Sequence, residues 1–276
     1  MSRTLDLDSE DLSPIELAKR QACHMAVDEN LPKSAKVIGI GSGSTVVYVV
    51  ERLLKKPGIE NVVFLPTGFQ SKELIVSNGL RLGDPDCYPD VDVAFDGADE
   101  VDANLNCIKG GGACLFQEKL IAVLTKRLVI VADSRKNSEK LGAYWVKGVP
   151  IEVVPMAYTF VLRELKRLGC KEPKLRMGAP GKAGPLVTDN GNFIIDANFG
   201  LIDKPEELFK QIKLIIGVVE VGIFSQMIQS AYFGNPDGSV TVKKNDGTQR
   251  IIPAEVTVAS AVQQKITGEN PNVITV

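Results

Sequence analysis

Short apolar runs alternate with amphipathic segments through the first half of the chain. Each run is five or six residues long and fits a strand that is buried on both faces of a parallel sheet. Between the runs, apolar residues recur at helical spacing, and Ser13 followed by Pro14 marks the start of the first helix. This order predicts an α/β fold with a doubly wound, mostly parallel (Rossmann-like) sheet. The expected strands are 36–40, 61–66, 91–95 and 127–132, and the expected helices are 14–29, 46–56, one that ends near Gly79, and 113–126.

A different order of elements begins after Pro150. A strand is followed by a helix, two strands separated by Asn190-Gly191, a second helix and a last strand. The Asn-Gly pair is a strong signal for a β-hairpin. The order βαββαβ predicts a second, smaller ferredoxin-like α+β domain. Its expected elements are strand 151–154, helix 156–168, strands 185–188 and 192–196, helix 205–215 and strand 217–223.

The chain is expected to leave the second domain near Gly234. Residues 235–238 carry a turn signal, and the alternating run 239–243 either returns to the first domain or pairs with another subunit. The predicted division is a Rossmann-like catalytic domain and a ferredoxin-like domain of usual size. The first comprises 1–149 and 234–276, and the second comprises 150–233; the sequence assigns no role to 243–276.

The loops that follow the predicted strands carry the candidate chemistry. Strand 36–40 runs into Gly41-Ser-Gly-Ser-Thr45 and then into a helix, an arrangement that binds anions through free N–H groups and the helix dipole. The turn matches neither the dinucleotide fingerprint nor the P-loop. We therefore expect it to bind the phosphate of a monoester. The alternative is a tight turn that only caps the helix.

The stretch Asp96–Lys119, DGADEVDANLNCIKGGGACLFQEK, combines acidic residues with three consecutive glycines. Such a segment suits close approach of the backbone to a ligand better than it suits a core; the alternative is a solvated surface loop. Glu118 lies on the apolar face of the expected helix, where desolvation raises the pKa of its carboxyl toward neutral pH. The alternative is a buried, structural salt bridge. Its neighbours at helical spacing are Cys114, Leu115, Ile121 and Ala122.

The composition argues against several classes of protein. The chain has 32 Lys and Arg against 34 Asp and Glu, so it lacks the basic surplus that would favour nucleic acid binding. Its five Cys form no CxxC pair, and its single His, His24, is interpreted as structural, so zinc-site spacing is absent. The scattered thiols indicate a reducing, cytoplasmic location. The first 30 residues show no secretory signal and no apolar run has the length of a membrane span, so no membrane contact is expected.

Six blocks of the sequence match one family in combination. They are GIGSGSTV (39–46), DGADEVD (96–102), KGGGACLFQEK (109–119), VIVADSRK (129–136), IEVVPMA (151–157) and LVTDNGNFIID (186–196). With them, most of 14–240 resembles type A ribose-5-phosphate isomerase. The resemblance implies interconversion of D-ribose 5-phosphate and D-ribulose 5-phosphate through a cis-enediolate, in the non-oxidative branch of the pentose phosphate pathway. It implies no metal and no organic cofactor, and a homo-oligomer, either a dimer or a tetramer.

The same resemblance implies roles for individual residues. Glu118 matches the proton acceptor, and Asp96 matches a residue that assists opening of the furanose ring. A lysine of the first helix reaches the phosphate; Lys19 matches it best, and Arg20 is the alternative. Cys114 stands where a smaller residue is commoner and is expected to be tolerated as a small hydrophobe. The implied substrate contacts are Ser42, Gly43, Ser44, Thr45, Asp96, Gly97, Ala98, Asp99, Lys109, Gly110, Gly111, Gly112 and Lys136.

The residue types fit the chemistry of an aldose–ketose isomerase. The reaction moves a proton between adjacent carbons, and one held carboxyl, that of Glu118, can serve both steps. Lys109 and the glycine N–H groups can stabilise the negative charge of the enediolate. Asp96 and Asp99 are expected to bind sugar hydroxyls, while the distant phosphate supplies binding energy that fixes the geometry.

Two other functions occur on related folds. A non-catalytic sugar-phosphate sensor would need an N-terminal helix-turn-helix. Only about 35 residues precede the first strand, which is too few for one, and the segment is acidic overall. An acyl-CoA transferase would use a glutamate nucleophile, but the 41–45 turn and the DGADE sequence do not suit coenzyme A. An assay for ketose formation from ribose 5-phosphate separates these functions from an isomerase.

Overall fold

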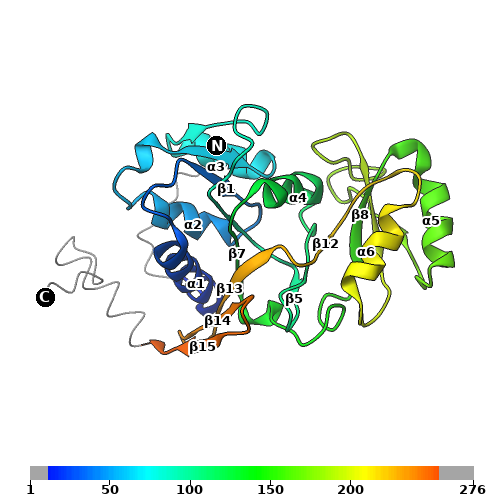
Figure 1. Ribbon diagram of the computed structural model, residues 1–276. Helices are drawn as coiled ribbons and strands as arrows, with labels where there is room; N and C mark the ends of the chain where they lie inside the picture. Colours follow the sequence, from blue (N-terminus) through cyan, green and yellow to red (C-terminus); the bar gives the residue numbers. More distant parts are fainter. Residues whose placement is uncertain (1–11, 255–276) are drawn as a thin grey trace, which may run out of the picture.

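The largest element of the fold is an eight-stranded sheet, seen in a computed structural model that describes residues 12–254 (Figure 1). Its order is β15-β14-β13-β7-β4-β1-β2-β3, and the six strands from β13 to β3 are parallel. The predicted doubly wound, mostly parallel sheet is thereby confirmed. The strands are β1 Val37–Ile40, β2 Val63–Pro66, β3 Arg81–Leu82, β4 Val93–Asp96, β7 Leu128–Asp133, β13 Ile228–Gly234, β14 Val240–Lys244 and β15 Gln249–Ile252.

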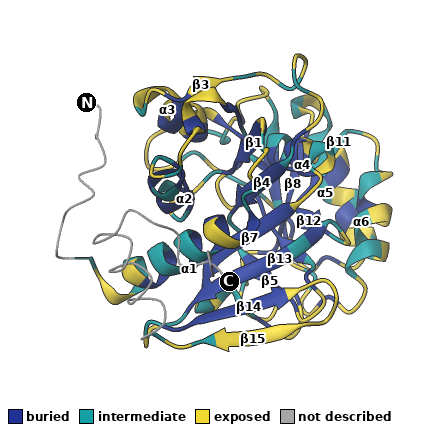
Figure 2. Ribbon diagram, turned by 60° about the vertical axis from the view of Figure 1, so that its left-hand side comes forward, coloured by how far each residue is buried: buried dark blue, intermediate teal, exposed yellow. Residues whose placement is uncertain are grey.

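Helices cover both faces of this sheet, because alternate residues of each buried strand point to opposite sides. Ile38 and Ile40 of β1 pack with the first three helices, whereas Val37 packs on the opposite face with Ile121 of the fourth. The buried strands between these layers form the dark centre of Figure 2, and the edge strands β3 and β15 are exposed. The helices are α1 Pro14–Asn30, α2 Val46–Leu53, α3 Phe69–Ser77 and α4 Leu115–Leu124, with short 3-10 turns at Ile59–Asn61 and Ser134–Lys136.

A separate four-stranded antiparallel sheet lies beyond α4, on the right of Figure 1. Its order, β11-β8-β10-β9, places the first and third strands of a βαββαβ unit at the centre, as in a ferredoxin-like fold. It has its own apolar core with α5 and α6. Its elements are β8 Val149–Val153, the 3-10 turn Pro155–Ala157, α5 Tyr158–Arg167, β9 Lys174–Leu175, β10 Phe193–Ala197, α6 Pro205–Lys213 and β11 Val218–Val221.

The strand expected at 185–188 does not form. Residue Val187 makes only an isolated bridge to Phe193, and the hydrogen-bonded neighbour of β10 is β9. The hydroxyl of Thr188 accepts hydrogen bonds from the N–H groups of Asn190 and Asn192 at 3.2 and 3.1 Å. These bonds close a compact turn. The Asn190-Gly191 pair therefore lies in a tight turn, and the residues before the turn make almost no strand pairing.

The strand expected at 217–223 is divided between two sheets. Residues Val218–Val221 form β11, whereas Ile223–Phe224 form β12, which pairs with β6. The chain changes sheet at Gly222, whose N–H donates to Pro150 O at 2.7 Å. A Cβ at Gly222 would lie 2.2 Å from the carbonyl oxygen of Lys109, so only glycine fits this crossing. The resulting three-stranded sheet, β12-β6-β5, contains β5 Glu100–Val101 and β6 Cys107–Ile108 and lies between the two larger sheets (Figure 1).

The end of the described chain returns to the large sheet. The sequence did not predict β13, which enters that sheet at Ile228 and lies parallel to β7. The run 239–243 forms most of β14 and pairs with β13, so it returns to the first sheet. The exact division into two domains stays a prediction, and most of the tail 243–276 lies outside the described residues. Among residues 12–254, the structure contains no helix with the length and apolar character of a membrane span.

Candidate active site

A cavity of about 490 Å³ opens at the carboxyl ends of β1, β4 and β7. This is the edge at which ligands bind in open parallel sheets. Nearly all of the residues singled out in the sequence line it, although they come from five separate segments. They are Lys19, Ser42, Gly43, Ser44, Thr45, Gly97, Ala98, Asp99, Lys109, Gly110, Gly111, Gly112, Glu118 and Lys136. Asp96 does not line the cavity and lies against Lys109.

A buried lysine joins two carboxylates at the floor of the cavity. Lys109 Nζ lies 3.0 Å from Asp96 Oδ2 and 3.0 Å from Glu118 Oε1, and it also donates to the carbonyl oxygen of Gly97. All three charged side chains are buried. Lys109 directly follows β6, while Glu118 lies in the first turn of α4. The three-stranded sheet and the helix therefore hold the two ends of this contact independently.

The environment of Glu118 favours its neutral form. Burial raises the pKa of this carboxyl from its usual 4.5 to about 8; the charge of Asp96 adds to the rise, and Lys109 opposes it. Its Oε1 accepts a hydrogen bond from Lys109, whereas its buried Oε2 has no hydrogen-bond partner among the described residues. Glu118 thus presents one anchored and one unpaired oxygen, which suits a group that takes up and returns a proton.

Lys109 keeps its charge in this setting. Burial works against the ammonium, but the negative charge of Asp96, to which Glu118 adds when it is ionised, outweighs burial and raises the pKa of Lys109 above its ordinary value. Asp99, which lines the cavity, has its pKa raised mainly by burial, although an N–H of Gly111 donates to its Oδ2 at 2.7 Å. The cavity floor therefore offers a fixed positive charge beside two acids that protonate more readily than usual.

Asp96 fixes the start of the 41–45 turn. Its Oδ1 accepts hydrogen bonds from the N–H groups of Ser42 at 3.3 Å and Gly97 at 2.7 Å. A Cβ at Gly41 would lie 2.0 Å from the same oxygen, so the turn can approach the carboxylate only with glycine there. Both oxygens of Asp96 are thus engaged by the protein, which orients Lys109 and the turn together.

The 41–45 turn leads into α2, and Lys19 of α1 reaches it. Lys19 Nζ donates to Ser44 Oγ at 3.1 Å and pairs with Glu16 at 2.7 Å. Thr45 is the N-cap residue of α2, and its side chain makes no capping hydrogen bond, so the first N–H groups of the helix face the turn without a cap. Hydroxyls, a lysine and open helix N–H groups therefore meet at one end of the cavity, where they can bind a phosphate.

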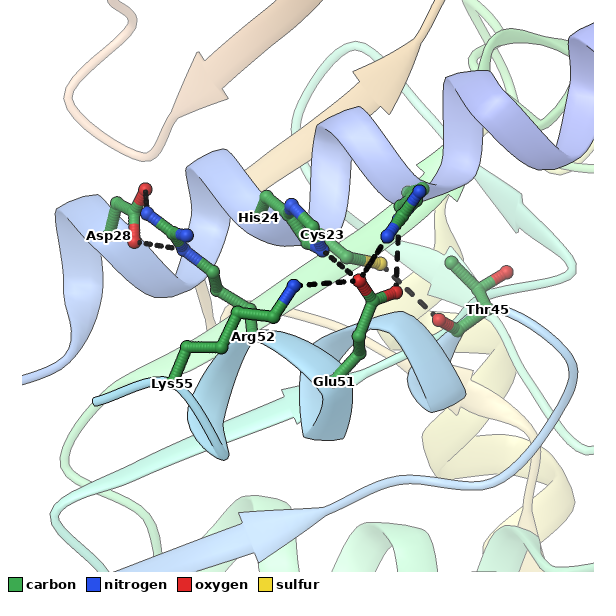
Figure 3. A network of polar contacts seen from close by, with 8 residues as sticks. Cys23, His24, Asp28, Thr45, Glu51, Arg52 and Lys55 are labelled. Atoms are coloured by element: carbon green, nitrogen blue, oxygen red, sulfur yellow. Dashed lines mark hydrogen bonds and ion pairs between the residues drawn. The ribbon is translucent and has the colours of Figure 1, made fainter. Parts of the chain in front are cut away.

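Arg20 lies outside this group because Glu51 of α2 holds it. The guanidinium donates to both carboxylate oxygens of Glu51, which also lies 3.4 Å from His24 and 3.3 Å from Lys55. Figure 3 shows this network between α1 and α2, together with the bond from Cys23 Sγ to the carbonyl oxygen of Thr45. The network fixes the two helices against each other and so positions Lys19 above the turn.

The chain matches the family model of ribose 5-phosphate isomerase A (phosphoriboisomerase A) over residues 63–238. It is 77% identical over 250 residues to ribose-5-phosphate isomerase of Schizosaccharomyces pombe, a match that covers 91% of each chain. The chain belongs to the ribose 5-phosphate isomerase A family. It is also 58% identical to the Candida albicans ribose-5-phosphate isomerase, over 83% of this chain and 97% of that one.

Solved structures of family members share the fold. A D-ribose-5-phosphate isomerase in complex with phospho-erythronic acid superposes with a TM-score of 0.78 at 38% identity, over 83% of this chain and 99% of that chain. The Methanocaldococcus jannaschii ribose 5-phosphate isomerase A gives 0.75 at 40% identity, over 82% of this chain and 98% of that one. The family suggested by the motifs is therefore confirmed.

Several residues that line the cavity of this isomerase-family chain were not predicted as site residues. Gln70 brackets Gly43, because its Oε1 accepts from the N–H at 2.7 Å and its Nε2 donates to the carbonyl at 3.2 Å. Asp189, from the turn before β10, accepts a hydrogen bond from the N–H of Phe69 at 2.8 Å. The only signal for Gln70 was its place after the strand expected at 61–66, and the signal for Asp189 was the adjacent Asn-Gly turn.

Two further lysines connect the site to its surroundings. Lys136 Nζ lies 5.3 Å from the centre of the Trp145 ring, a cation–π contact at the cavity wall. Lys119, next to Glu118 on α4, is buried and donates to the carbonyl oxygens of Val221 and Ile223, each at 2.6 Å. Burial lowers the pKa of Lys119 to about 8. The residue thus ties the helix of Glu118 to the segment where the chain crosses between sheets.

Proposed function

We propose that the protein interconverts D-ribose 5-phosphate and D-ribulose 5-phosphate, and that Glu118 carries the transferred proton. The family to which the chain belongs supports the reaction. The observation that carries the residue assignment is the 3.0 Å contact between Lys109 and the buried Glu118, in the same cavity as the 41–45 turn. An acid with a pKa of about 8 and a charged lysine beside it match the needs of enediolate chemistry.

The proposed reaction starts from the open-chain aldose. The carboxylate of Glu118 removes the proton from C2, and the electron pair moves to O1 as the cis-enediolate forms. Lys109 and the N–H groups of the glycine loop stabilise the charge on that oxygen. A proton then passes from the hydroxyl on C2 to O1, and Glu118 delivers its proton to C1, which leaves the carbonyl at C2. The atoms balance, and Glu118 returns to its starting state.

The two aspartates divide the remaining work in this proposal. Asp99 lines the cavity and has a raised pKa, so it is placed to exchange protons with sugar hydroxyls. Asp96 lies behind Lys109 with both oxygens engaged, so its main contribution is to orient the ammonium. Ring opening, which the family resemblance connects with Asp96, is accordingly placed at the Asp96–Lys109 pair together with Asp99.

The substrate phosphate is assigned to the other end of the cavity. Ser42, Ser44 and Thr45 supply hydroxyls, the N-terminus of α2 supplies N–H groups, and Lys19 supplies charge. Lys136, which also lines the cavity, adds a second positive charge. A relative of this chain was solved in complex with phospho-erythronic acid, which is a phosphorylated sugar acid. The phosphate end thus fixes the sugar while the other end reacts.

The deciding experiment is isomerisation in D2O. The wild-type protein should convert ribose 5-phosphate to ribulose 5-phosphate, with deuterium at C1 of the ketose because the Glu118 proton exchanges with solvent. Glu118→Gln should bind substrate but turn over roughly 10²–10⁴-fold more slowly. Binding without turnover by the wild type would favour a sugar-phosphate sensor, and near-normal turnover by Glu118→Gln would remove that residue from the reaction.

We also propose a cytoplasmic homo-oligomer, either a dimer or a tetramer. The three most exposed large apolar side chains of the second sheet region, Met156, Leu214 and Ile216, are 94%, 84% and 80% exposed, which supports burial against another subunit. All five cysteines are unpaired, as expected in a reducing compartment. Light scattering should give a mass of two or four chains, and fractionated cells should hold the protein in the cytosol. A monomer at micromolar protein concentration would contradict the proposed homo-oligomer.

A further inference from the structure

An arginine of the second sheet reaches into the glycine loop of the active site. Arg176, which follows β9, donates through Nη1 to the carbonyl oxygens of Gly110 at 2.9 Å and Gly111 at 3.1 Å. These two glycines belong to the loop that joins Lys109 to α4. The contact joins the four-stranded sheet, which supplies none of the proposed catalytic residues, to the loop between β6 and α4 that lines the cavity.

The direction of these bonds fixes the direction of the loop N–H groups. In a trans peptide the C=O and N–H point to opposite sides. Because the carbonyls of Gly110 and Gly111 both point to Arg176, the N–H groups of Gly111 and Gly112 point away from it. The N–H of Gly111 donates to Asp99 Oδ2 at 2.7 Å. The N–H of Gly112, a residue that lines the cavity, has no hydrogen-bond partner among the described residues. Successive N–H groups on one side form a nest that binds anionic oxygen.

The carboxylate of Asp196 holds Arg176 in place. Asp196 of β10 accepts two hydrogen bonds from Arg176, one from Nε at 2.8 Å and one from Nη2 at 2.5 Å. The two side chains are 15% and 18% exposed, so solvent reaches this pair only partly. The planar guanidinium can make a bidentate pair with a carboxylate and still direct its remaining N–H groups at the two carbonyls. A lysine in this position has the charge but cannot make this fork.

The loop also fits closely against Asp99. A Cβ at Gly111 would lie 2.4 Å from Asp99 Oδ1, so the peptide that Arg176 holds is pressed against a cavity carboxylate. Rotation of the 110–111 peptide would move the N–H of Gly111 off the Asp99 oxygen, and rotation of the 111–112 peptide would redirect the N–H of Gly112.

We propose that Arg176, held by Asp196, is a positioning residue that aims the N–H groups of Gly111 and Gly112 at Asp99 and at the charged oxygen of the reacting sugar. This role rests on the proposed isomerase function, because it assigns the loop N–H groups to the enediolate. Through Arg176, the four-stranded sheet contributes directly to the geometry of the proposed catalytic site.

The test uses four full-length proteins: wild type, Arg176→Met, Arg176→Lys and the control Lys174→Met. Lys174 lies on the same strand β9, is 66% exposed and, within residues 12–254, forms an ion pair only with the exposed Glu172. Steady-state rates with ribose 5-phosphate give kcat and KM. Hydrogen–deuterium exchange followed by mass spectrometry reports the order of peptide 109–114 without reference to activity, and melting temperatures check the fold of each variant.

Arg176→Met should lower kcat by roughly 10²-fold, the scale of a small misplacement of catalytic groups, while KM stays near the wild-type value because the phosphate end is untouched. The kcat of Arg176→Lys should lie between the values of Arg176→Met and the wild type, and the kcat of Lys174→Met should match the wild type. Amide exchange in 109–114 should speed up only in the Arg176 variants.

A wild-type kcat in Arg176→Met, or unchanged exchange in 109–114, would show that the guanidinium only joins β9 to β10. The two proposals remain separable. If the wild-type protein fails to isomerise ribose 5-phosphate, the proposed function is wrong, and the exchange measurement still decides whether Arg176 orders the loop.

Discussion

The pH dependence of turnover tests the buried carboxyl of Glu118 most directly. The residue must be ionised to remove a proton from C2, but burial raises its pKa to about 8. The active fraction of the free enzyme should therefore still be rising at pH values where an ordinary glutamate has long been fully ionised. Raising the pH from 7 to 9 is the perturbation, and kcat/KM for ribose 5-phosphate is the quantity to follow.

The size of the effect follows from the pKa. A group with a pKa of about 8 is ionised in about 9% of molecules at pH 7, about 50% at pH 8 and about 91% at pH 9. We expect kcat/KM to rise about fivefold between pH 7 and 8 and about tenfold between pH 7 and 9. The substrate does not contribute, because a phosphate monoester with a second pKa of about 6 is already a dianion in this range.

Initial rates at low substrate concentration measure this profile. Because the pKa of Lys119 is also about 8, circular dichroism at each pH should establish that the protein stays folded, so that rates refer to folded enzyme. Lys109 keeps its charge throughout, since its pKa lies above the ordinary value. A flat profile from pH 7 to 9 in an active enzyme would refute the reasoning, because it would mean that the proton acceptor is not a desolvated Glu118.

Three further predictions concern stability, the phosphate end and the cavity wall. Because the pKa of Glu118 is raised, the stability that this side chain contributes is fully present below about pH 4.5 and is lost as the pH rises through about 8. The melting temperature of Glu118→Gln relative to wild type should therefore increase from pH 6 to pH 9. A difference in melting temperature that stays constant over this range would argue against the raised pKa. Ser44→Ala should raise KM with little change in kcat, because the proposed phosphate site lies far from the reacting carbons. A loss of kcat alone would contradict that assignment of the phosphate. Trp145 is the only tryptophan of the chain, and its ring contacts Lys136. Ribose 5-phosphate should therefore change the tryptophan fluorescence by drawing Lys136 away from the ring. The same addition of ribose 5-phosphate to Lys136→Met should change the fluorescence little.

The architecture of the large sheet was predictable because its signals are local. Apolar runs such as 36–40 and 127–132 read as buried strands, and each ends where a polar loop begins. Parallel strands bring their carboxyl ends to one edge, so the sequence alone placed the 41–45 turn near Asp96. The apolar neighbours of Glu118 likewise indicated burial, and the structure leaves that side chain 6% exposed.

The parts that the sequence did not predict depend on contacts between distant segments. Arg176 and Gln70 act on backbone groups of Gly110 and Gly43, and a backbone carbonyl or N–H leaves no signature in the sequence. The strand expected at 217–223 had one continuous apolar pattern, yet the chain changes sheet within it, because Gly222 meets the backbone of Lys109. Such a crossing is decided by tertiary packing and not by local preference.

Lys119 has a consequence for how this enzyme can change over evolutionary time. Its ammonium binds the main-chain carbonyls of Val221 and Ile223, which any amino acid provides. Substitutions of Val221 and Ile223 can therefore accumulate without breaking these two hydrogen bonds, provided that Gly222 and the backbone path are kept. A substitution of Lys119 itself has no such tolerance, because the helix that bears the neighbouring Glu118 would lose both of these hydrogen bonds. Surveys of natural variation should find varied residues at positions 221 and 223 and constant residues at 119 and 222.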